Sequence, residues 1–112
     1  MVEKTMDKLN DYLLHHTPPT AIICATDTIA MGCMKVLKDH GLRIPEDVSV
    51  TGFGGYWTSS VISPALTTIK FHYAYAGQMA GQIILDMINE KEVEHATLID
   101  YTFIEGESVR SI

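Results

Sequence analysis

The apolar residues at the start of the chain recur every three or four positions. They are Val2, Met6, Leu9 and Leu13. This spacing places them on one face of a helix whose other face is polar. The pattern stops at Thr17-Pro18-Pro19, because proline and the residue before it disfavour helix. We therefore predict a one-sided surface helix followed by a turn.

A strand and a second helix are predicted next. The run from Ala21 to Ala25 is apolar without alternation, which predicts a strand covered on both faces. Thr26, Asp27 and Thr28 follow, and side chains of these types cap helices. Gly41 is suited to end the helix in a left-handed conformation. The helix should point these residues inward: Ile29, Cys33, Val36 and Leu37.

A second strand is predicted from Val48 to Phe53. A strand, a helix and a strand in this order form a parallel pair through a right-handed crossover. Both strands then end at the same edge of the sheet. The predicted fold class is therefore α/β, with a parallel sheet flanked by helices.

The rest of the chain predicts a loop, a crossing segment, a helix and a strand. Residues 56–64 show no period and predict a loop with at most one helical turn. Residues 67–71 are extended, and a long amphipathic helix runs from Tyr73 to about Asn89. Gly77 and Gly81 suggest that this helix packs closely. A half-covered final strand is indicated by the alternation of Ile99, Tyr101 and Phe103 with Asp100 and Thr102.

Length and charge restrict the possible functions. A chain of 112 residues permits one domain with a modest core, and its 46% hydrophobic content suits a chain that buries surface against a partner. The formal net charge of -6 argues against contact with a phosphate backbone, which needs clustered Lys and Arg. No signal-peptide pattern and no apolar run of membrane-spanning length is present.

No catalytic or metal-binding constellation is recognisable. Cys24 and Cys33 are nine residues apart, without a CxxC motif, and are expected to be buried, reduced thiols. Asp86 and Glu90 fall on an exposed helix face. The histidines follow no HExxH or other metal-binding spacing, and we expect neither metal nor cofactor. They are His15, His16, His40, His72 and His95.

Ligands of an open parallel sheet bind beyond the carboxyl ends of its strands. This rule selects two loops, Thr26-Asp27-Thr28 and Gly54-Gly55-Tyr56-Trp57. Their hydroxyls, carboxylate, backbone amides and aromatic faces suit a polyhydroxylated ligand such as a sugar.

Each of these residues also has a purely structural interpretation. Asp27 or Thr28 can cap the helix, and the glycine pair can simply allow a turn with positive φ. Trp57 can belong to a packed interface. Tyr73 starts a helix whose other large residues point into a core, so core packing is its alternative.

Four segments carry a resemblance to a known family. They are Pro45-Glu-Asp-Val-Ser-Val-Thr-Gly-Phe53, Ser63-Pro-Ala-Leu-Thr-Thr-Ile69, Pro19-Thr-Ala-Ile-Ile-Cys-Ala-Thr-Asp27 and Phe103-Ile-Glu-Gly-Glu-Ser108. Together they resemble the bacterial repressors of the lactose and galactose repressor family over nearly the whole chain. The resemblance implies a partial periplasmic-binding-protein-like fold of type I, from the C-terminal part of an effector-binding domain. The family's helix-turn-helix and first ligand-binding subdomain have no counterpart here.

The resemblance also implies a division of the chain. Residues 1–66 would form the core of the C-terminal subdomain. Residues 67–112 would hold the hinge crossing, the long helix and the closing strand. The helix and strand would then belong to the other subdomain of the family, and the crossing from Thr67 to Phe71 would be the hinge.

The resemblance assigns effector-binding roles residue by residue. The family's usual Asn-Asp pair after the first strand corresponds to Thr26-Asp27, so a hydroxyl replaces an amide. Its usual acidic pair after the second strand corresponds to Gly54-Gly55. A similar Gly-Gly pair in sucrose- and trehalose-type repressors favours a disaccharide or its phosphate. Tyr73 would stack on the effector.

A homodimer is implied as well. The resemblance places Met31, Val61 and Ile62 at the dimer interface. Their apolar character supports this, because an exposed loop rarely keeps Val-Ile without a partner. Local core contact is the alternative.

The expected function is therefore effector sensing in a cytoplasmic, sugar-responsive transcriptional repressor that is not an enzyme. It would contact operator DNA only through the missing helix-turn-helix. The alternative is a soluble sugar-binding receptor of a transport system, which shares the fold. A glycoside hydrolase would need an acid and base pair, and Asp27 alone does not supply one.

Overall fold

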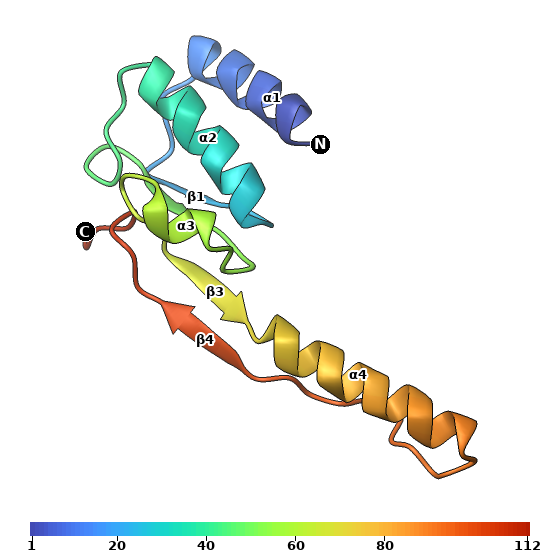
Figure 1. Ribbon diagram of the computed structural model, residues 1–112. Coiled ribbons are helices and arrows are strands. Elements are labelled where there is room, and N and C mark those ends of the chain that lie inside the picture. The colour runs from blue at the N-terminus through green and yellow to red at the C-terminus, as the bar shows by residue number, and fades with distance from the viewer. The chain divides into compact units, whose positions relative to one another are not determined.

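A computed structural model describes all 112 residues of the chain. It contains every predicted helix and strand (Figure 1). In chain order they are α1 (Val2–His15), β1 (Ala21–Ile23), α2 (Asp27–Asp39), β2 (Ser49–Thr51), α3 (Thr58–Val61), β3 (Thr68–Phe71), α4 (Tyr73–Ile88) and β4 (Tyr101–Ile104).

The chain divides into two compact units. The first comprises Met1–Lys70 and Phe103–Ile112, and the second comprises Phe71–Thr102. We expected the division after residue 66, which is four residues before Lys70, where the first stretch of this unit ends. The first unit keeps residues 67–70 because backbone hydrogen bonds join them to the end of β2, from Gly52 N to Thr67 O and from Gly54 N to Ile69 O.

The first unit is built on a short parallel sheet, as predicted. β1 and β2 pair in parallel, with Ile22 opposite Val50. The ladder continues towards β3 through the parallel pairs Thr51–Thr67 and Gly54–Lys70. The carboxyl ends of β1 and β2 therefore meet at one edge, where the two candidate loops begin.

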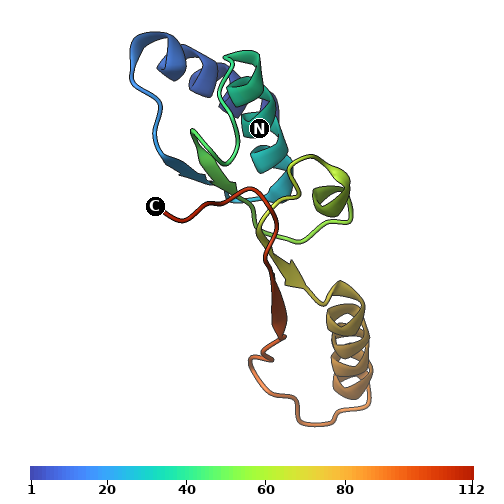
Figure 2. The same ribbon diagram turned by 90° about the vertical axis from the view of Figure 1, so that its left-hand side faces the viewer.

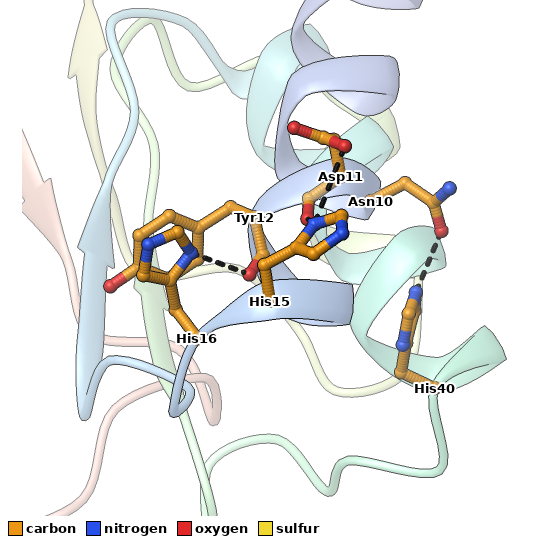
Figure 3. Close-up of polar contacts among 6 residues, drawn as sticks. All are labelled: Asn10, Asp11, Tyr12, His15, His16 and His40. Carbon is orange, nitrogen blue, oxygen red and sulfur yellow. Dashed lines mark hydrogen bonds and ion pairs between the residues drawn. The ribbon is translucent and has the colours of Figure 1, made fainter.

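α2 packs on this sheet and α1 packs on α2 (Figure 1). A hydrogen bond joins α1 to the end of α2. The His40 Nε2 atom, just after α2, lies 2.7 Å from the Asn10 side-chain oxygen, which accepts the bond (Figure 3). Gly41 has the predicted left-handed φ of 72° just after α2. The buried apolar core consists of Cys24, Ala30, Cys33, Met34, Leu37, Ile44, Val48, Val50 and Leu66.

The predicted coverage of β1 on both faces is wrong for this chain. Ile22 packs against the core, whereas the next side chain, Ile23, is 87% exposed. Successive side chains of a strand point to opposite faces. α2 covers one face, and no segment of this chain covers the side to which Ile23 points.

The C-terminal segment returns to the first unit (Figure 2) and is held by Ser108. This fully buried hydroxyl donates to the Val50 carbonyl at 2.6 Å and accepts from the Thr67 amide at 2.9 Å. The Val50 amide in turn donates to the Ser108 carbonyl. One serine therefore links the tail to both β2 and the start of β3.

The second unit consists of α4 and the segment that leads to β4. α4 has no buried residue, and its Ile84, Leu85, Met87 and Ile88 are each more than half exposed. The close packing expected at Gly77 and Gly81 is absent, because a Cβ at either would meet no atom within 4 Å. β4 likewise has no buried residue, so it is not the half-covered strand that was predicted. None of the helices combines the length and apolar character needed to cross a bilayer.

Replacing Ser108 should destabilise the first unit. We expect Ser108→Ala to lower the free energy of unfolding by about 2 kcal/mol, because a buried carbonyl and a buried amide both lose their partner. Urea unfolding followed by circular dichroism measures this. Ser111→Ala, at an exposed serine of the same tail, is the control and should change stability by less than about 0.5 kcal/mol. Equal stability of the two variants would refute the role of Ser108.

Candidate functional site

Asp27 is the first residue of α2 and is completely buried. Its Oδ2 atom accepts hydrogen bonds from the Tyr56 amide at 2.9 Å and the Ser59 hydroxyl at 2.5 Å. Its Oδ1 atom accepts from the Thr68 hydroxyl at 2.6 Å. These donors satisfy a carboxylate that would otherwise be costly to bury.

The Asp27 side chain has no exposed surface in this chain, and its oxygens accept hydrogen bonds from protein groups. Its predicted contact with an effector stays a prediction. Asp27 fixes the loop after β2 against α2. The helix cap comes from Thr26, whose hydroxyl accepts from the Ile29 amide at 3.2 Å, and not from Asp27 or Thr28.

Gly54 and Gly55 have positive φ values of 131° and 69°, as the structural alternative expected. Gly55 also lies against the neighbouring strand, because a Cβ added to it would be 2.4 Å from the Lys70 Cα. Gly52 is similarly constrained: its Cβ would lie 2.4 Å from Asp27 Oδ1. The glycines thus let the loop approach both β3 and the buried carboxylate.

A cavity of about 290 Å³ lies beside this loop, entirely within the first unit. It includes three of the predicted effector-binding residues, Gly55, Tyr56 and Trp57. Trp57 is 76% exposed, so its ring is available to a ligand or a partner. The other lining residues are Ser59, Ser60, Leu66, Thr68, Lys70 and Ile104.

Several of these lining residues were not predicted. Ser59 and Thr68 gave no recognisable signal, since isolated hydroxyl residues are common in loops and strands. Lys70 could have been noticed as the charged residue of the crossing segment at residues 67–71. Hydrogen bonds to Asp27 bring these residues together. Ser59 is 32 residues from Asp27 in the chain, and Thr68 is 41 residues from it.

Tyr73 belongs to the second unit and is 53% exposed at the start of α4. Its ring meets the Phe71 ring edge to face, with centroids 6.0 Å apart. The core-packing alternative for Tyr73 is therefore wrong in this chain. Its predicted stacking on an effector stays a prediction.

Two of the predicted dimer residues come together on a second surface of the first unit. Met31 from α2 and Ile62 after α3 line the same open cavity of about 450 Å³. Val61 is 65% exposed beside them. Across this cavity the Lys38 ammonium donates a hydrogen bond to the Ser63 carbonyl. The remaining lining residues are Met34, Lys35 and Asp39.

The two cysteines are free and buried, as predicted. A hydrogen bond with Cys33, together with burial, raises the pKa of the Cys24 thiol well above its usual range. A thiol in this state stays protonated at neutral pH and is a poor nucleophile. No group of His, Cys, Asp and Glu side chains in the chain is arranged to hold a metal ion.

The first unit is an α/β fold with a parallel sheet and a cavity at the carboxyl ends of its strands, which is where ligands of such folds bind. The family model that matches residues 2–109 is the periplasmic binding protein-like domain, and the chain belongs to this family. Its relatives include transcriptional repressors and regulators, and the similar solved structures include the Lac repressor.

The HTH-type transcriptional repressor PurR of Pasteurella multocida is 37% identical over 90 residues. This match covers 80% of the chain but 27% of the relative. The probable repressor ExuR of Bacillus subtilis is 35% identical over 96 residues, which cover 85% of the chain and 29% of the relative. The chain thus spans between a quarter and a third of the length of these relatives.

Solved structures agree with the sequence relatives. The Lac repressor dimer bound to operator and the anti-inducer ONPF superposes with a TM-score of 0.91 at 26% identity, over 98% of the chain and 38% of that structure. A regulator of the same family from Bifidobacterium animalis subsp. lactis gives a TM-score of 0.87 at 28% identity, over 97% and 40%. The predicted partial periplasmic-binding-protein-like fold is confirmed.

Asp27 should be essential for the stability of the site. We expect Asp27→Ala to lower the unfolding free energy by about 3 kcal/mol, because three donors lose their acceptor. Asp27→Asn should cost less, since the amide oxygen still accepts. Urea unfolding measures both.

Asp39→Ala is the matched control for this experiment. Asp39 forms an exposed ion pair with Lys35 at 2.6 Å, and its loss should cost less than about 0.5 kcal/mol. If Asp27→Ala were as mild as Asp39→Ala, the buried carboxylate would not organise the site.

Proposed function

We propose that this chain is the effector-sensing and dimerising part of a sugar-responsive transcriptional repressor and that it has no catalytic role. The carrying observation is the cavity that Gly55, Tyr56 and Trp57 line at the loop after β2. Its place in a fold shared with repressors supports an effector site. With a net charge of -6, this chain is not the DNA-binding part, which would be a helix-turn-helix outside it.

The chemistry of the cavity supports a sugar as effector. The exposed Trp57 ring and Tyr56 can cover the apolar face of a sugar ring. The exposed Ser60 hydroxyl lines the same space, and its oxygen can accept a hydrogen bond from a sugar hydroxyl. We retain Thr26, Gly54 and Tyr73 as further effector residues, and we propose a disaccharide or its phosphate as the effector.

Control of DNA binding would work through subdomain closure in the cytoplasm. Residues 1–66 would form the C-terminal subdomain core and residues 67–112 the crossing, helix and closing strand. The crossing from Thr67 to Phe71 would act as the hinge. A sugar that binds one closure state better than the other shifts the equilibrium between them, and thereby changes the affinity for operator DNA.

The first test uses the natural full-length polypeptide that carries this chain and the DNA upstream of its gene. We expect a sugar from a panel of hexoses, disaccharides and their phosphates to change the DNA affinity at least fivefold, measured by fluorescence anisotropy. Trp57→Ala should weaken sugar binding about tenfold, while Trp57→Phe keeps most of it. If sugars bind but no DNA does, the protein is a transport-type receptor and not a repressor.

The dimer surface gives a separate prediction. We expect Met31→Glu or Ile62→Glu to raise the dimer dissociation constant about a hundredfold, because each replaces an apolar contact of the interface with a hydrated carboxylate. Sedimentation of the full-length protein measures this. The control is Leu14→Glu, at an apolar residue of α1 that is 65% exposed. It should leave the dimer intact. An undisturbed dimer in all three variants would place the interface elsewhere.

A further inference from the structure

Lys70 is the only charged residue that lines the cavity beside the β2 loop. The other lining side chains are aromatic, aliphatic or hydroxyl-bearing, and no carboxylate is among them. The nearby Asp27 carboxylate has no exposed surface and is engaged by Ser59 and Thr68. An anionic group in the cavity would therefore meet a positive charge and no exposed negative one.

The Lys70 backbone and the first carbons of its side chain contact neighbouring residues, and its ammonium forms no ion pair in this chain. Its backbone is paired with Gly54, and the Gly55 backbone lies against the first carbons of its side chain. Lys70 is exposed and takes part in none of the ion pairs of the chain. Those pairs are Asp11–His15, Lys35–Asp39, Arg43–Asp47 and Asp86–Lys91.

The Ser and Thr hydroxyl groups around the cavity donate their protons to acceptors within the protein. Ser59 and Thr68 donate to the Asp27 carboxylate, and Ser60 donates to the Trp57 carbonyl at 2.7 Å. A hydroxyl that donates elsewhere keeps lone pairs, and the exposed Ser60 oxygen can accept a hydrogen bond from a ligand, whereas Ser59 and Thr68 are buried. The Lys70 ammonium is then the one side chain of the lining with several protons to donate.

This distribution fits a ligand of two parts. A sugar hydroxyl can donate to the Ser60 oxygen, while an acidic group accepts from the Lys70 ammonium. A hydrogen bond between oppositely charged groups is stronger than one between neutral groups. A wholly neutral sugar would leave the ammonium without its best acceptor.

We propose that Lys70 makes this cavity selective for an acidic sugar, either a sugar phosphate or a uronate, whose anionic group binds the ammonium. This proposal rests on the proposed role of the cavity as the effector site. Of the effectors proposed above, it favours the charged one, a sugar phosphate, over a neutral disaccharide, and it adds uronates.

The test compares matched neutral and acidic sugars on the natural full-length polypeptide by isothermal titration calorimetry at constant salt. The probes are glucose, glucose 6-phosphate and glucuronate, the corresponding galactose series, and sucrose with sucrose 6-phosphate. We expect one acidic member to bind at least about tenfold more tightly than its neutral counterpart. The phosphate and the carboxylate probes distinguish the two sources of charge.

Substitutions identify the residue that is responsible. Lys70→Met should abolish the preference for the acidic sugar, Lys70→Arg should retain it, and Lys8→Met, which removes an exposed charge on α1, should leave it unchanged. Raising the salt concentration should weaken the binding of the acidic sugar and leave the binding of the neutral sugar unchanged.

Two results would overturn the proposal in distinguishable ways. Neutral sugars that bind as well as acidic ones, with no effect of Lys70→Met, would refute the acidic selectivity and leave the sugar-sensing function intact. Failure of every sugar to bind or to alter DNA affinity would refute the sugar-sensing function itself, and the acidic selectivity with it.

Discussion

The carboxylate of Asp27 holds the site together, because a buried charge must be satisfied by several donors at once. Its donors come from the loop after β2, from α3 and from β3, which are 29, 32 and 41 residues away in the chain. Gly52 must lack a side chain for the same reason, since a Cβ there would strike the carboxylate. The shape of the cavity is therefore tied to the start of α2.

The same two segments build both candidate surfaces of the first unit. α2 begins at the Asp27 network and continues along the surface that Met31 lines. Ser59 of α3 lines the cavity, and Ile62, which directly follows α3, lines the candidate dimer surface. A ligand at the first surface and a second copy of the chain at the other would thus contact neighbouring residues of the same rigid elements.

Some apolar side chains of this chain are buried in a core, and others are exposed to solvent. The core around α2 is closed, whereas Ile23 on β1 and Ile88 on α4 are 87% and 70% exposed. These faces explain why the apolar patterns overestimated burial at β1, Gly77 and Gly81. A hydrophobic pattern reports which side chains are suited to burial and not which segment covers them.

The sequence by itself determined the order of helices and strands, the parallel pairing and the family, because these follow from local periodicity, helix-capping residues and short characteristic strings such as Pro45–Phe53. It also brought Gly55, Tyr56 and Trp57 into one candidate site, since strand ends in a parallel sheet share an edge. Only the tertiary structure decided that Asp27 is a buried anchor and that Lys70 is the charged group of the cavity. Those roles depend on contacts between residues tens of positions apart, which no local pattern records.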